Sequence, residues 1–338
     1  MPERIYKTLN FAYPGNIPNG KTLLTGIRPD KHSNNKFYIT GFYNSPLGGP
    51  VLSYIYRGKL NDFGKSYQNT WNLLSYPSSD GKNVSATNLY GPNSGPSKKI
   101  IRAVGNYTLE GAEKTPYGCL YEGPLTPTDE NPGQWRTLIP NIEGGDKTVL
   151  NVIAHSTIGD FVVGNYDTLL IQGKAFLYSI SKDQYWEIIQ DNAKSMTAYG
   201  IWQNSKNSYT ICGGYTDLTL PNFEKAYLLD WDSKLQKFSN FRTYTYNNSQ
   251  DTKITHFNGI YGDQKGYTCT GDTENGGFIF RLPFKNKVSS KGSKGFWEPL
   301  AFPGSKSTSG NSVVKSTVIG VTIDSNGKTN GYVSTVIC

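Results

Sequence analysis

Short runs in which apolar and polar residues alternate fill the chain, and turns rich in Gly, Asn, Pro and Ser separate them. Alternation with a period of two is typical of a half-buried β-strand, whereas an amphipathic helix repeats every 3.6 residues. No segment shows a convincing helical repeat, so a solenoid of strands and helices is disfavoured. The pattern therefore predicts an all-β protein made of many short strands.

Three motifs recur six times along the chain. In the first, an apolar residue follows an aromatic one three positions later, as in Trp186…Ile189. The second is a β-rich run that ends in Gly-x-Tyr or Gly-x-Thr, as in the segment DFVVGNYDT at 160–168. The third places a small residue before an aromatic and an apolar pair, as in KAFLYS at 174–179. One further strand precedes the second motif, so each repeat contains four short strands.

Four strands in a repeat of roughly 50 residues match the blade of a β-propeller. The first motif opens the chain at Tyr6, and the third motif closes it at 331–338. We expect the N-terminal strand to pair with the last blade, since this closes the ring and covers two strand edges. Residues 1–338 are thus predicted to form one six-bladed β-propeller with four-stranded blades. A β-sandwich has no six-fold repeat, and a β-helix has shorter rungs.

Composition and charge restrict the partners. No apolar run approaches the roughly 18 residues that cross a bilayer, so we expect no membrane partner. The formal charge is +8, but the Lys residues are spread through loops instead of forming a basic face with stacking aromatics. We therefore expect no nucleic-acid partner. The oligomeric state is not indicated.

Two features bear on the compartment. Glycosylation sequons begin at Asn83, Asn106 and Asn247. Four cysteines permit two disulfides, at Cys119, Cys212, Cys269 and Cys338. Both features favour a secreted protein whose leader is missing from this sequence, because the first four residues do not resemble a signal peptide. The alternative is a cytoplasmic protein with four buried or free thiols.

The first strand of each blade lines the central channel of a propeller, so its residues are candidates for a site. When the six strands are aligned by their ends, one mouth of the channel is ringed by Arg28, Tyr90, His155, Trp202, Tyr261 and Lys315. Three aromatic rings, two cations and an imidazole suit an organic molecule of moderate size. The alternative is that these bulky side chains plug the channel.

Roles within this ring follow from the chemistry of the side chains. The residues assigned to catalysis, as hydrogen-bond donors or as groups that move a proton, are His155, Tyr90, Arg28 and Lys315. The residues assigned to substrate binding are Trp202, Tyr261, His256 and Asn88. The end positions contain no Asp or Glu, which argues against a glycosidase with two opposed carboxylates. No metal-ligand spacing and no phosphate-binding loop is present, so we expect neither a metal nor a cofactor.

The segments 100–123 and 155–179 combine a Val-Gly-x-Tyr strand with a strand that contains an aromatic and Tyr. They resemble the repeats of a family of secreted bacterial and fungal propellers, most of which have no assigned activity. The chain also resembles the fungal hetero-Diels–Alderases of tropolonic sesquiterpenoid biosynthesis. This second resemblance implies a cofactor-independent cycloaddition, in which an o-quinone methide is generated and captured by an alkene of a macrocyclic terpene. Such a reaction needs a cavity that aligns both partners and donors that polarise the heterodiene oxygen.

Two other functions are compatible with the sequence. One is a lectin-like propeller that binds a carbohydrate or another ligand without catalysis, and the other is a protein-interaction scaffold. A multivalent lectin would repeat its site in every blade, whereas the six end residues differ except for two Tyr. The sequence therefore favours one asymmetric central site, in an enzyme that acts on a small organic molecule.

Overall fold

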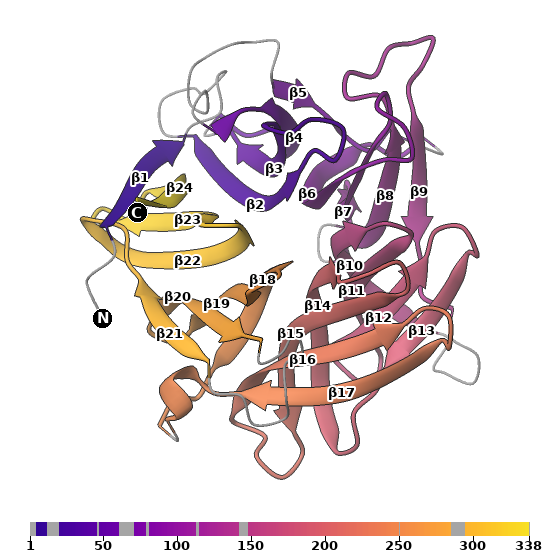
Figure 1. The fold of residues 1–338 in the computed structure, drawn as a ribbon. Coiled ribbons are helices and arrows are strands. Elements are labelled where there is room, and N and C mark those ends of the chain that lie inside the picture. The colour runs from indigo at the N-terminus through magenta and orange to yellow at the C-terminus, as the bar shows by residue number, and fades with distance from the viewer. Residues whose placement is uncertain are drawn as a thin grey trace.

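The computed structural model describes residues 5–11, 20–45, 47–60, 71–78, 81–112, 115–141, 148–249, 251–284 and 295–337. Within these ranges the chain forms six antiparallel sheets, arranged as blades around a central axis (Figure 1). The structure confirms the predicted all-β, six-bladed propeller. No helix of the described ranges has the length and apolar character needed to cross a bilayer.

Each blade is a meander of four strands that follow one another from the axis outward. Blade 1 contains β2 (Lys21–Pro29), β3 (Phe37–Asn44), β4 (Leu52–Gly58) and β5 (Trp71–Leu73), and blade 2 contains β6 (Val84–Ser94), β7 (Ile101–Leu109), β8 (Tyr117–Gly123) and β9 (Gln134–Leu138). Blade 3 contains β10 (Val149–Ile158), β11 (Phe161–Thr168), β12 (Lys174–Ser179) and β13 (Gln184–Ile188). Blade 4 contains β14 (Ala193–Gln203), β15 (Ser208–Asp217), β16 (Glu224–Asp232) and β17 (Lys237–Tyr244), followed by the short 3₁₀ helix Tyr246–Asn248. Blade 5 contains β18 (Thr255–Asp263), β19 (Gly266–Thr273), β20 (Gly276–Pro283) and β21 (Phe296–Leu300).

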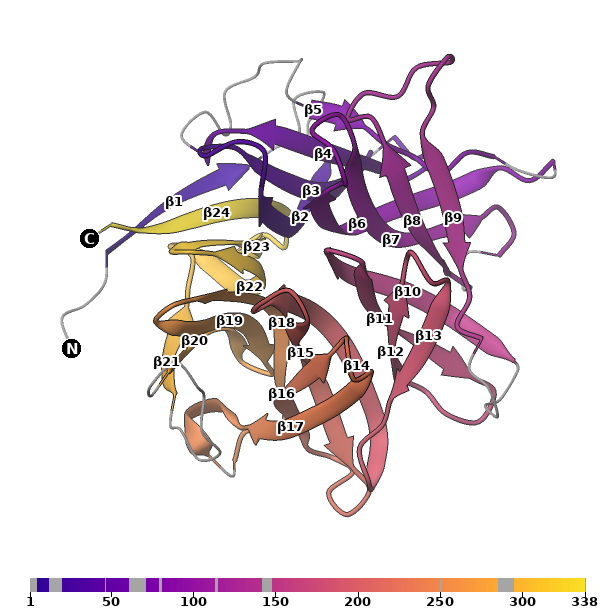
Figure 2. The same cartoon turned by 45° about the vertical axis from the view of Figure 1, so that its right-hand side comes forward.

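Blade 6 is assembled from both ends of the sequence. It contains β22 (Ser305–Val314), β23 (Thr317–Asp324), β24 (Thr329–Ile337) and, outermost, β1 (Ile5–Phe11). Strand β1 pairs antiparallel with β24, in a register that runs from Ile5↔Ile337 to Phe11↔Gly331. Figure 2 shows the two strands side by side at the edge of this blade.

A glycine occupies the same position in the second strand of every blade: Gly41, Gly105, Gly164, Gly213, Gly271 and Gly320. A Cβ atom at any of these positions would lie only 1.8–2.2 Å from a carbonyl oxygen of the inner strand. Only a residue without a side chain permits this approach of two backbones. The glycine of the second sequence motif therefore marks the position at which the first and second strands of a blade approach closely.

The aromatic residue of the third motif lies directly across from that glycine in five of the blades. These residues are Tyr54, Phe176, Tyr227, Phe278 and Tyr332, and blade 2 has Cys119 instead. Each ring covers the surface that the glycine leaves bare. In three blades the hydroxyl also donates to the same inner-strand carbonyl, for example from Tyr227 to Thr197 O at 2.9 Å.

Every inner strand contains a β-bulge at an equivalent position, namely Thr25, Tyr90, His155, Tyr199, Asn258 and Asn311, and four of the strands have a second register shift nearer their start. A bulge adds one residue that has no partner on the neighbouring strand and bends the strand locally. The next residue is always Gly or Ser, which leaves room for the adjacent blade. The bulges therefore mark the residues that are structurally equivalent in the six blades.

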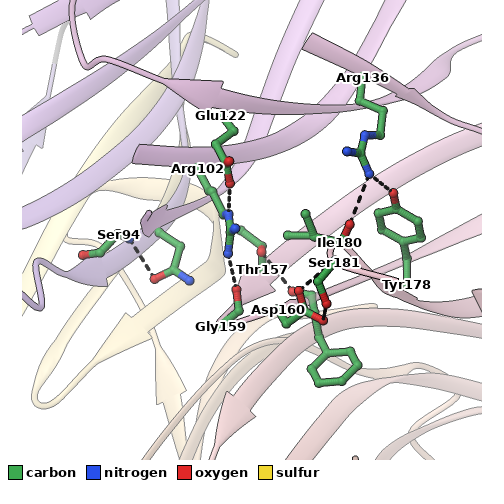
Figure 3. Close-up of polar contacts among 12 residues, drawn as sticks. Ser94, Arg102, Glu122, Arg136, Thr157, Gly159, Asp160, Tyr178, Ile180 and Ser181 are labelled. Carbon is green, nitrogen blue, oxygen red and sulfur yellow. Dashed lines mark hydrogen bonds and ion pairs between the residues drawn. The ribbon is translucent and has the colours of Figure 1, made fainter. Parts of the chain in front are cut away.

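The apolar core lies between the blades. One cluster combines Val163 and Leu177 of blade 3 with Met196, Ala198 and Ile201 of blade 4, and all five are buried. Polar contacts join blades at the face where the inner strands end, which we call the lower face. There Arg102 of blade 2 pairs with Glu122 and donates to Gly159 O of blade 3 at 2.6 Å (Figure 3).

The described cysteines are thiols, whereas the sequence permitted two disulfides. Cys119, Cys212 and Cys269 are buried free thiols, so two disulfides do not form. Burial raises the pKa of the Cys212 thiol to about 12, which keeps it protonated and unreactive. Cys338 lies outside the described residues. The sequon at Asn106 is 4% exposed, and its side chain accepts a hydrogen bond from Asn88.

The contact at Gly213 provides a test of the blade geometry. We expect Gly213→Ala to lower the free energy of unfolding by about 3 kcal/mol or more, because the new methyl group must displace the Thr197 carbonyl. Chemical denaturation followed by circular dichroism measures this change. Ser205→Ala, in an exposed turn, is the control and should be neutral. Equal stability of the two variants would contradict the close contact.

Candidate functional site

The bulges show which residues of the inner strands are equivalent, and they replace the alignment by strand ends that was used for the sequence. Tyr90 and His155 were aligned with Arg28, but they are equivalent to Thr25. Strands β6 and β10 continue beyond Tyr90 and His155, to Ser94 and Ile158, and β6 does so through Gly-Pro-Asn at 91–93, a combination typical of turns. Pairing with the neighbouring strand outweighs the local turn preference of this sequence.

Lys315 also lies elsewhere than predicted. It follows β22 in the turn to β23, with φ +53°, and lines a pocket at the lower face. Trp202 and Tyr261 lie at the lower ends of their strands, with ring centroids 4.8 Å apart. The eight predicted site residues therefore do not form one site. Tyr90 and His155 line the channel, and His256 and Asn88 stand above them.

The six bulge residues surround the narrowest part of the channel, and we call them the inner ring: Thr25, Tyr90, His155, Tyr199, Asn258 and Asn311. The His155 and Tyr199 rings stack at 3.8 Å with an interplanar angle of 17°. The space left between these side chains is about 20 Å³, which suffices for about one water molecule. An organic ligand of moderate size therefore does not fit inside the channel.

Arg28 fills the channel below the inner ring. Its guanidinium donates to Ile260 O at 3.1 Å, to Ile201 O at 2.9 Å and to Ser156 Oγ at 3.0 Å. Burial lowers the pKa of Arg28 to about 10, so the group is still charged at neutral pH. Its donors are engaged by three other blades, which indicates a structural role at the axis.

The groups of the inner ring are neutral at physiological pH. Burial raises the pKa of Tyr90 and of Tyr199 to about 12, so both phenols keep their protons and can donate hydrogen bonds. Burial lowers the pKa of His155 to about 3. Its Nε2 lies 2.6 Å from Asn165 Oδ1, and this oxygen accepts a hydrogen bond from the ring N–H. His155 is therefore a poor proton acceptor at neutral pH.

Six half-exposed side chains stand two positions before the bulges and form what we call the mouth: Leu23, Asn88, Ile153, Thr197, His256 and Ser309. His256 is distinguished by a carboxylate partner, since its Nδ1 lies 2.5 Å from Glu224 Oε1 of β16. Gly214 makes room for this pair, because a Cβ there would lie 1.8 Å from Glu224 Oε1 and 2.3 Å from His256 Nδ1.

A second carboxylate flanks the same histidine. Asp272 of β19 is directly across from His256 in the register of the two strands. It accepts hydrogen bonds from Asn258 Nδ2 at 2.5 Å and from the Gly310 amide at 3.3 Å. Burial raises the pKa of Asp272 above its ordinary value despite these donors, so it holds a proton to a higher pH than a typical Asp.

Tyr199 connects the mouth with the inner ring. The edge of the His256 ring faces it at a centroid distance of 4.4 Å and an angle of 82°. Within the described residues, His256 Nε2 is buried and has no hydrogen-bond partner. Tyr199, Glu224 and Asp272 were not identified from the sequence. The Gly that follows Tyr199 would have revealed the bulge position, but nothing local marks the two carboxylates.

The part of the chain that the structure describes contains no group of three or more His, Cys, Asp and Glu side chains placed to hold a metal ion. Asp30 and Asp160 are engaged in turns at the lower face, where Asp160 accepts from Ser179 Oγ at 2.6 Å and from Ser181 N at 2.9 Å. The polar and titratable groups that lie together near the axis are Tyr199, Glu224, His256 and Asp272.

No protein-family model and no curated protein sequence matches the chain. Solved structures do. The GH93 α-L-arabinofuranosidase of Fusarium graminearum, solved with arabinobiose, is 12% identical with a TM-score of 0.51, over 94% of this chain and 93% of that one. The Nup133 propeller of Vanderwaltozyma polyspora is 11% identical with a TM-score of 0.37, over 97% of each chain.

A third match is the propeller domain of the trilobed protease from Pyrococcus furiosus. It is 9% identical with a TM-score of 0.39, over 93% of this chain and 95% of that one. The six sheets define a six-bladed β-propeller, and the GH93 arabinofuranosidase resembles the chain in fold. At these identities the likeness shows the fold alone, and function has to be argued from the site.

The neutral, buried His155 predicts a specific acid sensitivity. Its pKa is lower in the folded than in the unfolded protein, so its contribution to stability is present above pH 6.5 and is lost as the pH falls towards 3. This contribution changes by up to about 1.4 kcal/mol per pH unit. In urea unfolding between pH 7 and 4, His155→Asn should show a weaker pH dependence than the wild type. His32→Asn is the control, and identical slopes in all three proteins would contradict the buried, neutral state.

Proposed function

We propose that the protein is an enzyme that binds a small organic molecule over the mouth of the channel and transforms it by general acid–base catalysis. The observation that carries this proposal is the pair of carboxylates around one histidine. Glu224 accepts a hydrogen bond from His256, whereas Asp272 is buried with a raised pKa. An acidic group with a perturbed pKa that stands beside other titratable side chains is a candidate for catalysis.

The roles follow from the state of each group. Asp272 is the proton donor, because its raised pKa keeps it protonated where an ordinary Asp is ionised. Glu224 is the proton acceptor, with a side chain 29% exposed and a position fixed by His256. The protonated phenols of Tyr90 and Tyr199 donate hydrogen bonds to an oxygen that gains negative charge during the reaction. His155, assigned to proton transfer from the sequence, instead orients the Tyr199 ring by stacking.

The substrate lies over the mouth, because the inner ring leaves only about 20 Å³ below it. The hetero-Diels–Alder reaction implied by the sequence resemblance is supported by the two phenol donors and by the apolar Leu23 and Ile153 at the mouth. A terpenoid partner would then rest across these residues, on the outside of the channel.

Hydrolysis of a glycosidic bond is the second candidate, and the two carboxylates favour it. This reaction requires one carboxylic acid that protonates the leaving oxygen and one carboxylate that acts as base or nucleophile. Asp272 and Glu224 supply this combination from β19 and β16.

The test uses two substrate sets with the purified protein. One set is a panel of aryl glycosides, and the other is a small-molecule extract of the source organism analysed by mass spectrometry. We expect turnover of one substrate, reduced about 10²–10⁴-fold in Asp272→Asn and in Gly214→Ala, which pushes Glu224 away from His256. Leu235→Ala, exposed on the lower face, is the matched control.

The outcomes separate the candidates. Cleavage of an aryl glycoside establishes hydrolysis, and conversion of an extract component into a single stereoisomer establishes the cycloaddition. If a compound co-purifies but is not transformed, the lectin-like alternative replaces the enzyme. If turnover is unchanged in both variants, the two carboxylates are not the catalytic groups.

The raised pKa of Asp272 also predicts a pH profile. Activity should fall on the alkaline side as Asp272 loses its proton, at a higher pH than an ordinary Asp would give. The residual activity of Asp272→Asn should lack this limb, because an amide does not titrate. Measurement of kcat/KM against pH in both proteins checks this. An alkaline limb that persists in the variant would assign it to another group.

A further inference from the structure

A groove at the lower face lies between blades 4 and 5, away from the mouth. Its cavity volume is about 540 Å³, in the range that holds small ligands. Its principal side chains are Trp202, Asn204, Asp230, Asn240, Tyr267 and Phe284. Three aromatic rings alternate here with two amides and a carboxylate, and the proposed function uses none of them.

The polar groups of the groove are held in place before any ligand binds. Asp230 accepts from Thr210 Oγ1 at 2.8 Å and from Arg242 Nη2 at 2.7 Å on one oxygen, and from Asn240 Nδ2 at 2.7 Å on the other. The Tyr267 hydroxyl donates to Asn204 Oδ1 at 2.8 Å. Since a carboxylate offers about four acceptor positions, Asp230 Oδ2 has one left for a ligand hydroxyl.

Trp202 forms a fixed wall of the groove. Tyr261 packs against its ring at 4.8 Å, and the Arg28 guanidinium lies 5.8 Å from its centroid. Gly262 permits the indole to lie against the backbone, because a Cβ there would be 2.6 Å from Trp202 Nε1. A rigid indole offers a flat apolar surface together with one N–H donor.

The aromatic, amide and carboxylate side chains of the groove together indicate which kind of ligand it binds. A hydroxyl group both donates and accepts, which matches adjacent amide and carboxylate groups. The aromatic walls require a ligand with an apolar face as well. The carboxylates of Asp230 and Asp263 disfavour anions, and the ion pair of Asp230 with Arg242 weakens the attraction for a cation. A neutral ring that carries hydroxyls on its rim and C–H groups on its face meets all three conditions.

The equivalent groove between blades 5 and 6 has the same volume but different chemistry. It is also about 540 Å³, yet Arg281 stands where blade 4 has Asp230, and Lys315 of blade 6 lines it. No amide side chain lines it. The set of amides, carboxylate and indole therefore belongs to one groove and is not a consequence of the repeat.

We propose that the groove between blades 4 and 5 binds a neutral mono- or disaccharide, stacked on Trp202 and hydrogen-bonded to Asp230, Asn240 and Asn204. This site is separate from the mouth and does not depend on the proposed function. It holds a sugar without transforming it, since Arg242 neutralises Asp230 and the backbone amides of Lys265 and Gly266 occupy Asp263 Oδ1.

Isothermal titration of the full chain with arabinobiose, xylobiose, cellobiose and maltose tests the proposal. We expect one of them to bind with a stoichiometry of one, and Trp202→Ala and Asn240→Gly to weaken it about tenfold or more. Glycine is chosen at position 240 because Asn240 has φ +54°, which glycine adopts without strain. Thermal melting confirms that each variant is folded.

Two controls separate this site from others. Phe296→Ala alters the neighbouring groove, and Asp272→Asn alters the mouth; both should bind the sugar as the wild type does. The proposal is overturned if none of the four sugars binds, or if binding survives both groove substitutions. It is also overturned if Asp272→Asn abolishes binding while Trp202→Ala does not, a result that would place the sugar at the mouth and support the proposed function instead.

Discussion

The contact between an inner-strand carbonyl and a glycine of the second strand determines the shape of each blade. At Gly271 the distance from the position of a Cβ to His256 O would be 1.8 Å, so the strands approach only because no side chain is present. The covering aromatic ring and, in three blades, its hydroxyl complete the contact. The bulge follows immediately on the inner strand, and six bulges in register create the narrow ring at the axis.

The same contact positions the candidate site. The residue whose carbonyl oxygen faces the glycine is also the residue whose side chain stands at the mouth. The position of this backbone carbonyl therefore determines where the side chain lies. In blade 5 this residue is His256, so Gly271 orients the histidine that meets Glu224 and Asp272. A scaffold interaction common to all blades thus places a chemical group that occurs in one of them.

Blades 4 and 5 differ from the other blades at a few equivalent positions, and these differences bring polar side chains together. The position after the second-strand glycine is Gly214 in blade 4, where it admits the Glu224–His256 pair, and Asp272 in blade 5. On the opposite face, the same two blades combine Trp202 with Asp230 and Asn240 in one groove. The repeat therefore builds the ring, and substitutions at equivalent positions of two neighbouring blades give it two distinct polar sites.

The all-β class, the six blades and the four strands in each could be predicted from the amino-acid sequence, because alternation, the Gly motif and the aromatic motif report contacts within one blade. The sequence also identified Tyr90, His155 and His256 as residues near the axis. That Arg28 fills the channel, and that Lys315 and Trp202 lie at the lower face, became evident from the folded chain alone. Bulge positions depend on pairing between strands. Glu224 lies 32 residues before His256 in the sequence and contacts it from the third strand of the preceding blade. Such convergence leaves no periodic trace in the sequence, since it arises from the packing of separate blades.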